Sequence, residues 1–326
     1  MSRQPVAADA ALPAALSLIR RQPFLLALVL LAGLALMNYA LQPNYFRPAT
    51  LRTFLPLILV AAGQTLVIIG GGVDLSLGAI VALANVVVVR LLGDGSDPGL
   101  LLPALLGGLA AGAAAGLANG LLVAYLRFQP IVTTFATSFI FSGLALWILE
   151  RPGGSVPPVA LSLYAGSLLG VPVALWVIAA LLLLWAALRA TRYGGYLYAV
   201  GGDALAAYVS GVPVALVRAS SYALAGALAA CGAAALVLET GSGSPLFGGS
   251  TTTLGSVVAV VLGGTRLSGG QGGLFGSVLG VLILGLIRSI ISFAGIPTWY
   301  QVLVDGLIVM FALAGPGLFA LLRRRR

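Results

Sequence analysis

The sequence predicts an all-α fold: a polytopic transmembrane helix bundle with about ten spans, some of them short or discontinuous. Three observations predict it. Hydrophobic residues fill 60% of the 326 positions and charged residues only 8%, whereas roughly 25% of a soluble domain is charged. Apolar stretches of spanning length recur along the chain, and glycine-rich segments interrupt them. Because so few charges cannot cover a surface in water, we expect the lipid bilayer to surround most of the protein.

Apolar stretches near the length of about 20 residues that crosses a bilayer mark the candidate spans. The eighth is too short to cross alone, and the fourth is long enough to tilt. We expect one membrane domain over residues 23–320, with a cytoplasmic segment at 1–22 before it and an Arg tail at 321–326 after it. The candidate spans are Phe24–Leu41, Leu51–Ile69, Val73–Leu92, Leu100–Leu126, Ile131–Leu149, Val171–Leu188, Val212–Leu238, Thr253–Leu262, Leu274–Phe293 and Trp299–Leu318.

The arginines predict the orientation. An even number of spans puts both termini on one side, and the side with more basic residues faces the cytoplasm. The smaller, external set is Arg47, Arg52, Arg90, Arg151 and Arg288. The larger, cytoplasmic set is Arg3, Arg20, Arg21, Arg127, Arg189, Arg192, Arg218, Arg266 and Arg323–Arg326. We therefore interpret the net charge of +9 as membrane topology, with both termini cytoplasmic, and expect no nucleic-acid partner.

Missing residue types limit the chemistry. The chain contains no His and no Lys, and its one cysteine is Cys231. The sequence therefore predicts no metal site, no disulfide within the chain and no bound cofactor. A phosphate-binding loop needs the lysine of G-x-x-x-x-G-K-[ST]. If ATP drives this protein, another chain must bind it, so we expect a transport subunit and not an enzyme.

Two glycine-rich segments break the apolar pattern, Gly70–Gly78 and Gly263–Gly273. Non-helical backbone at membrane depth is tolerated only against protein or a wet cavity, and broken helices commonly surround transporter sites. A turn at the membrane surface is the alternative interpretation. The glycines that we expect to break the helices are Gly71, Gly72, Gly78, Gly263, Gly264, Gly269 and Gly270.

Glycines and small residues also recur every four positions in three spans, as at Gly108, Gly112, Gly116 and Gly120. Small residues at this spacing let helix backbones approach closely. The pattern predicts tight packing within the bundle, with a dimer interface or a moving surface as the alternative.

Polar residues inside the spans are candidates for a solute path. Asp74 follows three glycines and begins a predicted span, where its carboxylate could cap the helix by accepting from the amides of Leu75–Leu77 or could contact a hydroxylated solute. For the others, hydrogen bonds between helices are the alternative role. The path candidates are Asp74, Ser76, Gln64, Asn85, Asn119, Thr133, Thr134 and Thr137.

The longest predicted cytoplasmic segment spans residues 189–213. Asp203 is a plausible N-cap, Ala204–Ser210 a short helix, and Gly211 and Pro213 end it. Such a helix can insert into a groove of a partner, or it can simply join two spans. The residues that we single out are Gly201, Gly202, Asp203, Ala206, Ala207, Ser210 and Gly211.

Three segments together resemble the permeases of bacterial ABC importers of the ribose, xylose and galactofuranose type. Gly71-Gly-Val-Asp-Leu-Ser-Leu-Gly78 is similar to the family signature G-G-[IV]-D-L-S-x-G. Thr191–Gly211 resembles the segment that contains Y-A-[IV]-G-G, and Val260–Gly276 resembles V-V-[LI]-G-G-T-x-L-x-G-G-x-G-x-x-x-G. The likeness runs from about residue 50 to 315.

The resemblance implies a transport complex. Its other members would be an ABC ATPase subunit, an extracytoplasmic solute-binding protein and a second copy of this permease or a homologous one. It also implies that Gly201–Gly211 receives the ATPase stroke. The sequence departs from the pattern at Gly195, Asp203 and Gln271, where Arg, Asn and a basic residue are common. Alternatives are a permease for branched-chain amino acids or nucleosides and, more distantly, a passive channel or an ion-coupled carrier.

Overall fold

The computed structural model describes residues 23–297 together with 300, 303–304, 306–307 and 310. This part of the chain is mainly α-helical, which confirms the all-α prediction. Its one named pair of strands is a small antiparallel hairpin of β1 (Ser167–Leu168) and β2 (Val171–Pro172). The predicted segments at 1–22 and 321–326 lie outside the described residues, as does most of Trp299–Leu318.

The helices follow the apolar stretches closely. In chain order they are α2 (Pro23–Leu41), η1 (Pro43–Tyr45), α3 (Pro48–Ile69), α4 (Leu77–Leu92), η2 (Pro98–Leu100), α5 (Leu101–Ala124), α6 (Pro130–Ile148), α7 (Pro158–Ala165), α8 (Val173–Ala190), α9 (Arg192–Gly202), α10 (Ala204–Val209), α11 (Val214–Thr240), α12 (Gly249–Leu262) and α13 (Leu274–Phe293).

Six helices in the described part are long and apolar enough to cross a membrane, namely α3, α5, α6, α8, α11 and α13. Three apolar stretches are shorter, at Leu25–Leu41, Leu77–Leu92 and Gly249–Leu262. The protein is therefore polytopic, and the count of ten spans stays a prediction. The third expected span was placed too early: α4 begins at Leu77, not Val73, because the backbone from Gly70 to Ser76 is not helical.

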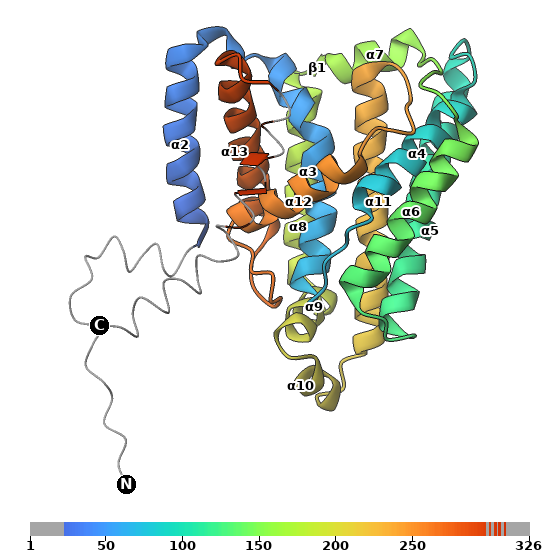
Figure 1. Ribbon diagram of the computed structural model, residues 1–326, viewed down its shortest axis with the longest axis vertical. Coiled ribbons are helices and arrows are strands. Elements are labelled where there is room, and N and C mark those ends of the chain that lie inside the picture. Colours follow the sequence, from blue (N-terminus) through green and yellow to red (C-terminus); the bar gives the residue numbers. More distant parts are fainter. Residues whose placement is uncertain (1–22, 298–299, 301–302, 305, 308–309, 311–326) are drawn as a thin grey trace, which may run out of the picture.

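The long helices run roughly side by side, with α7 at one end of the bundle and α9 and α10 at the other (Figure 1). We call these the α7 end and the α10 end. The α10 end also carries α9 and the start of α11. Two arginines of the opposite predicted sets lie toward opposite ends: Arg90 is in the last turn of α4 near the α7 end, and Arg189 is in the last turn of α8 near the α10 end. The orientation of the whole chain stays a prediction.

The glycine stripe on α5 packs within the bundle. A Cβ added at Gly112 would approach Gly226 O within 2.6 Å, and one added at Gly120 would approach Ala219 O within 2.5 Å, both on α11. Gly108 instead faces Ala84 and Val88 of α4. These backbones therefore touch only because no side chain separates them, which confirms packing within the bundle as the role of the stripe.

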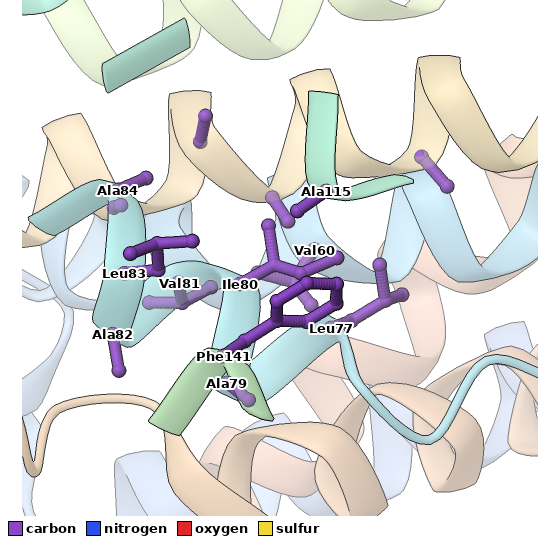
Figure 2. Close-up of a cluster of buried hydrophobic side chains, with 14 of the residues drawn as sticks. Val60, Leu77, Ala79, Ile80, Val81, Ala82, Leu83, Ala84, Ala115 and Phe141 are labelled. Carbon is purple, nitrogen blue, oxygen red and sulfur yellow. The ribbon is translucent and has the colours of Figure 1, made fainter. Parts of the chain in front are cut away.

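The short helix α4 lies at the centre of the bundle. It packs against α5, α6, α11 and α12, and nearly all of its residues are buried. Figure 2 shows its side chains with those of α3, α5 and α6, including Leu77, Ile80 and Phe141. A helix that is apolar on every side belongs in a core, so the non-helical segment before α4 is held deep within the protein.

Candidate functional site

Asp74 lies in the first glycine break, just before α4, and is fully buried. Its Oδ1 accepts a hydrogen bond from the backbone N–H of Ser76 at 2.7 Å and another from the Ser76 hydroxyl at 2.6 Å. Ser76, not Asp74, occupies the N-cap position of α4. The predicted cap is therefore corrected to a tight turn that fixes the backbone one residue before the helix.

The hydroxyl of Ser76 extends this turn to two other helices. Asn119 of α5 donates its side-chain N–H to Ser76 Oγ at 2.7 Å, and Thr137 of α6 donates to Asn119 Oδ1 at 2.7 Å. Thr134, one turn earlier on α6, accepts from the backbone N–H of Leu75 at 2.9 Å. We call Asp74, Ser76, Asn119 and Thr137 the buried network, which joins the break to α5 and α6.

Other path candidates lie elsewhere in the core. Asn85 of α4 accepts from the backbone N–H of Ser244 at 2.8 Å and so holds the connection between α11 and α12. Thr133 bonds back to Gln129 O within α6. Gln64 of α3 is fully buried, and its amide oxygen and nitrogen have no hydrogen-bond partner in the described part of the chain.

All eight path candidates are buried, with exposed fractions between 0% and 7%. In the arrangement described here they contact neighbouring helices, and the structure brings four of them together as one network. Whether they line a solute path in another conformation stays a prediction.

The α10 end carries the segment that was expected to meet a partner. Asp203 Oδ1 accepts from the backbone N–H groups of Leu205 and Ala206 at 2.9 and 3.0 Å, and α10 follows as Ala204–Val209. This confirms the predicted N-cap and short helix. The preceding helix α9 was not predicted from the sequence. It begins after Thr191, whose hydroxyl caps it by accepting from Gly194 N–H.

One face of α10 is apolar and exposed. Leu205, Tyr208 and Val209 are 72%, 69% and 79% exposed, whereas Ala207 is buried against the bundle. These three residues were not among the sequence-based candidates, although their spacing around the short helix could have identified them. Ala206 and Ser210 also lie on the exposed side.

Three glycine segments meet beside this helix. Gly270 N–H donates to Ile69 O at 2.9 Å, which joins the second break to the end of α3. A Cβ added at Gly269 would come within 2.6 Å of Gly201 O and 2.9 Å of Gly71 Cα. We call Ile69–Gly71, Gly201–Gly202 and Gly269–Gly270 the glycine junction, since it brings the end of α9 against both helix breaks.

Gly201 is the tightest point of the junction. An added Cβ there would overlap Ile69 O and lie 2.7 Å from Gly270 N, whereas one at the adjacent Gly202 would meet nothing within 4 Å. A second contact joins α9 to the glycine-rich segment before α13: the hydroxyl of Tyr198 donates a hydrogen bond to Gly272 O at 2.7 Å. Burial raises the pKa of Tyr198, against the opposing effect of Arg189, so the hydroxyl keeps the proton that it donates.

Comparisons with known proteins show which family the chain resembles. A family model described as "Branched-chain amino acid transport system / permease component" matches residues 47–313. The ribose import permease protein of Bacillus subtilis is 37% identical over 300 residues, which cover 89% of this chain and 90% of that protein.

Two further relatives come from Escherichia coli. The D-allose transport system permease protein is 30% identical, over 79% of this chain and 78% of its own length. An autoinducer 2 import system permease protein is 30% identical, over 80% of this chain and 81% of its own length. Because the family model and these relatives each match more than three quarters of the chain, the chain belongs to the family of branched-chain amino acid transport system permease components.

Proposed function

We propose that this chain is the membrane-spanning permease subunit of an ATP-driven ABC importer for a monosaccharide. The similar proteins named for ribose and D-allose transport support a sugar more than an amino acid. The partners are a separate ATPase, an extracytoplasmic solute-binding protein and a second permease, identical or homologous. The α10 end faces the cytoplasm of a bacterial cell, and the α7 end faces the binding protein.

The glycine junction is the observation that carries this proposal. The exposed apolar face of α10 offers an anchor for the ATPase, because buried aromatic and aliphatic side chains dominate the binding energy of interfaces. Movement of α10 passes through Asp203 to α9 and then to Ile69 and Gly270. Backbone atoms in direct contact leave no flexible side chain to absorb the motion. The stroke therefore reaches both helix breaks at once.

The buried network provides the fixed element in this mechanism, whereas the glycine junction transmits movement. Its hydrogen bonds join the start of α4 to α5 and α6. The start of α4 therefore stays in place while the end of α3 and the start of α13 move with α9. Alternating access requires such a fixed element against which another moves.

The experiment is to purify the chain from its native membrane with its complex and reconstitute the complex in liposomes. The proposal predicts a bound ATPase and ATP-dependent uptake of D-ribose or D-allose with the solute-binding protein present. Uptake of leucine but of no sugar would assign the chain to amino acids instead. Solute flux that needs neither ATP nor a partner would contradict the importer.

A docking test examines the α10 face. Val209→Asp places a charge on the exposed apolar surface, and we expect it to release the ATPase from the purified complex. Ser210→Asp, at the neighbouring exposed position, is the matched control and leaves more of the ATPase bound. Equal ATPase retention by both variants would remove the apolar face from the interface.

A further inference from the structure

A polar cleft opens at the α7 end, where η1, α3 and α13 meet. Its volume is about 470 Å³, within the range of roughly 300–1,000 Å³ typical of small-molecule sites. The polar side chains that line it are Gln42, Tyr45, Thr53, Arg288, Ser289 and Ser292. None of these belongs to the buried network, and only Arg288 among them carries a charge.

The sequence of α13 builds one wall of this cleft. Val281, Gly285, Arg288 and Ser292 follow one another at intervals of three or four residues and therefore share one face of the helix. A Cβ added at Gly285 would overlap the ring of Phe54 on α3. Glycine at this position thus lets the ring lie against α13, and Phe54 and Phe293 add aromatic surface to the lining.

Hydrogen bonds hold part of the lining in place. Gln42 donates its side-chain N–H to Ser289 Oγ at 3.3 Å and to Ser289 O at 3.4 Å. Burial raises the pKa of Tyr45, while a hydrogen bond with Ser289 acts in the other direction. The Tyr45 hydroxyl therefore stays protonated and can donate as well as accept.

This set of groups suits an uncharged ligand with many hydroxyl groups. Hydroxyl and amide side chains can each donate and accept, and the Arg288 guanidinium donates in a fixed fork. None of the described residues that line the cleft carries a carboxylate. The phenyl rings offer apolar surface to the C–H faces of a sugar ring.

Leu57 of α3 and Val281 of α13 are among the residues that line the cleft. The two helices pack against each other, and we call their contact the seam. One turn further along α13, Ser277 Oγ lies 2.7 Å from Thr65 Oγ1 of α3, and both residues are buried. At the other end of this pair, α3 ends and α13 begins beside the glycine junction, where Gly270 bonds to Ile69. The seam thus connects the cleft to the point where α9 acts.

We propose that this cleft is the entry subsite for the solute, where a monosaccharide ring binds before the α3–α13 seam opens. This proposal rests on the proposed function. Opening the seam requires separation of Thr65 from Ser277, and the glycine junction at its far end is where the ATPase stroke would cause it.

The single native cysteine allows a direct test by cysteine protection. In a Cys231→Ala background, Ser292→Cys places a thiol in the cleft and Ser96→Cys places one in the exposed α4–α5 connection. The intact complex in nanodiscs is treated with a membrane-impermeant thiol reagent, with and without D-ribose or D-allose. We expect either sugar to slow labelling of Ser292→Cys several-fold and to leave Ser96→Cys unchanged.

Two outcomes overturn the cleft proposal. One is labelling of Ser292→Cys that neither sugar slows. The other is protection by phosphatidylglycerol in the nanodisc with no effect of sugar, which would assign the cleft to an anionic lipid headgroup.

A second test of the cleft measures sugar uptake and needs no thiol labelling. Gly285→Ala forces the Phe54 ring into the cleft, whereas Gly143→Ala introduces a Cβ with nothing within 4 Å. We expect Gly285→Ala to reduce sugar uptake several-fold while ATP hydrolysis by the assembled complex persists, and Gly143→Ala to leave both unchanged.

The two proposals fail in different ways. If the unmodified complex imports no sugar, the proposed function is wrong. If it imports sugar and neither protection nor the effect of Gly285→Ala is seen, only the cleft assignment is wrong.

Discussion

Polar side chains gather at two places in this bundle, and they are satisfied in different ways. The buried network around Asp74 is enclosed: its members bond to one another and to backbone, and among the described residues Asp74 Oδ2 is its one buried atom without a hydrogen-bond partner. The cleft beside Arg288 is open, and its hydroxyl groups face a cavity. Polar residues within this apolar sequence thus fall into two groups. Those of the buried network fix a broken helix, and we propose that those of the cleft bind a ligand.

The largest expected effect is at the centre of the buried network. Asp74→Ala leaves the N–H and hydroxyl of Ser76 without their acceptor in the core, and unsatisfied buried groups cost roughly 1–3 kcal/mol each. We expect the free energy of unfolding to fall by about 3 kcal/mol, measured by denaturant titration in detergent. Asp74→Asn retains an acceptor oxygen and serves as the control, so an equal loss in both variants would contradict the network.

A smaller loss is expected at the edge of the network. Thr137→Val removes the donor to Asn119 Oδ1, and we expect a loss of about 1–2 kcal/mol in the same titration. Ser138→Val is the matched control, because Ser138 is half-buried and bonds to Phe135 O of its own helix instead of to the network. If Ser138→Val destabilised the protein as much as Thr137→Val, helix propensity and not the network would explain the loss.

Gln64 gives a prediction of the opposite sign. Its buried amide has no partner in the described structure, so Gln64→Leu removes an unsatisfied group and we expect a gain of about 1 kcal/mol in stability. Uptake should fall if the amide meets the solute when the seam opens. Unchanged uptake with greater stability would leave Gln64 without a transport role.

The smallest stability effect is expected in the cleft. Ser292 is exposed at the end of α13, so Ser292→Ala should change the free energy of unfolding by less than about 0.5 kcal/mol. A loss as large as that of Thr137→Val would mean that the cleft, like the network, is a structural feature.

The helices and the two breaks could be predicted because they depend on local properties. Apolar length marks spans, three consecutive glycines interrupt a helix, and Asp203 followed by Gly211 delimits α10. The meeting of Gly201 with Ile69 and Gly270 could not be predicted from composition, since it depends on how helices far apart in sequence pack. The resemblance identified all three segments but did not indicate that they touch.

The cleft could not be predicted from the sequence, again because it depends on how distant helices pack. Thr53, Ser289 and Ser292 look like isolated polar residues at the ends of two spans, and only the antiparallel packing of α3 and α13 brings them together. Gly285 gave no signal either, because the need for it comes from Phe54 on another helix.

We infer that the glycine junction transmits the movement of the ATPase to the helix breaks. One pair of variants tests this transmission. Gly201→Ala and Gly202→Ala make the same change in adjacent residues of the junction, but only the first adds an atom that would meet Ile69 and Gly270. Both would be compared in the reconstituted complex for ATP hydrolysis and sugar uptake. We expect Gly201→Ala to retain assembly and hydrolysis while losing most uptake, and Gly202→Ala to behave like the unmodified protein. Equal uptake by the two variants would contradict transmission through the junction.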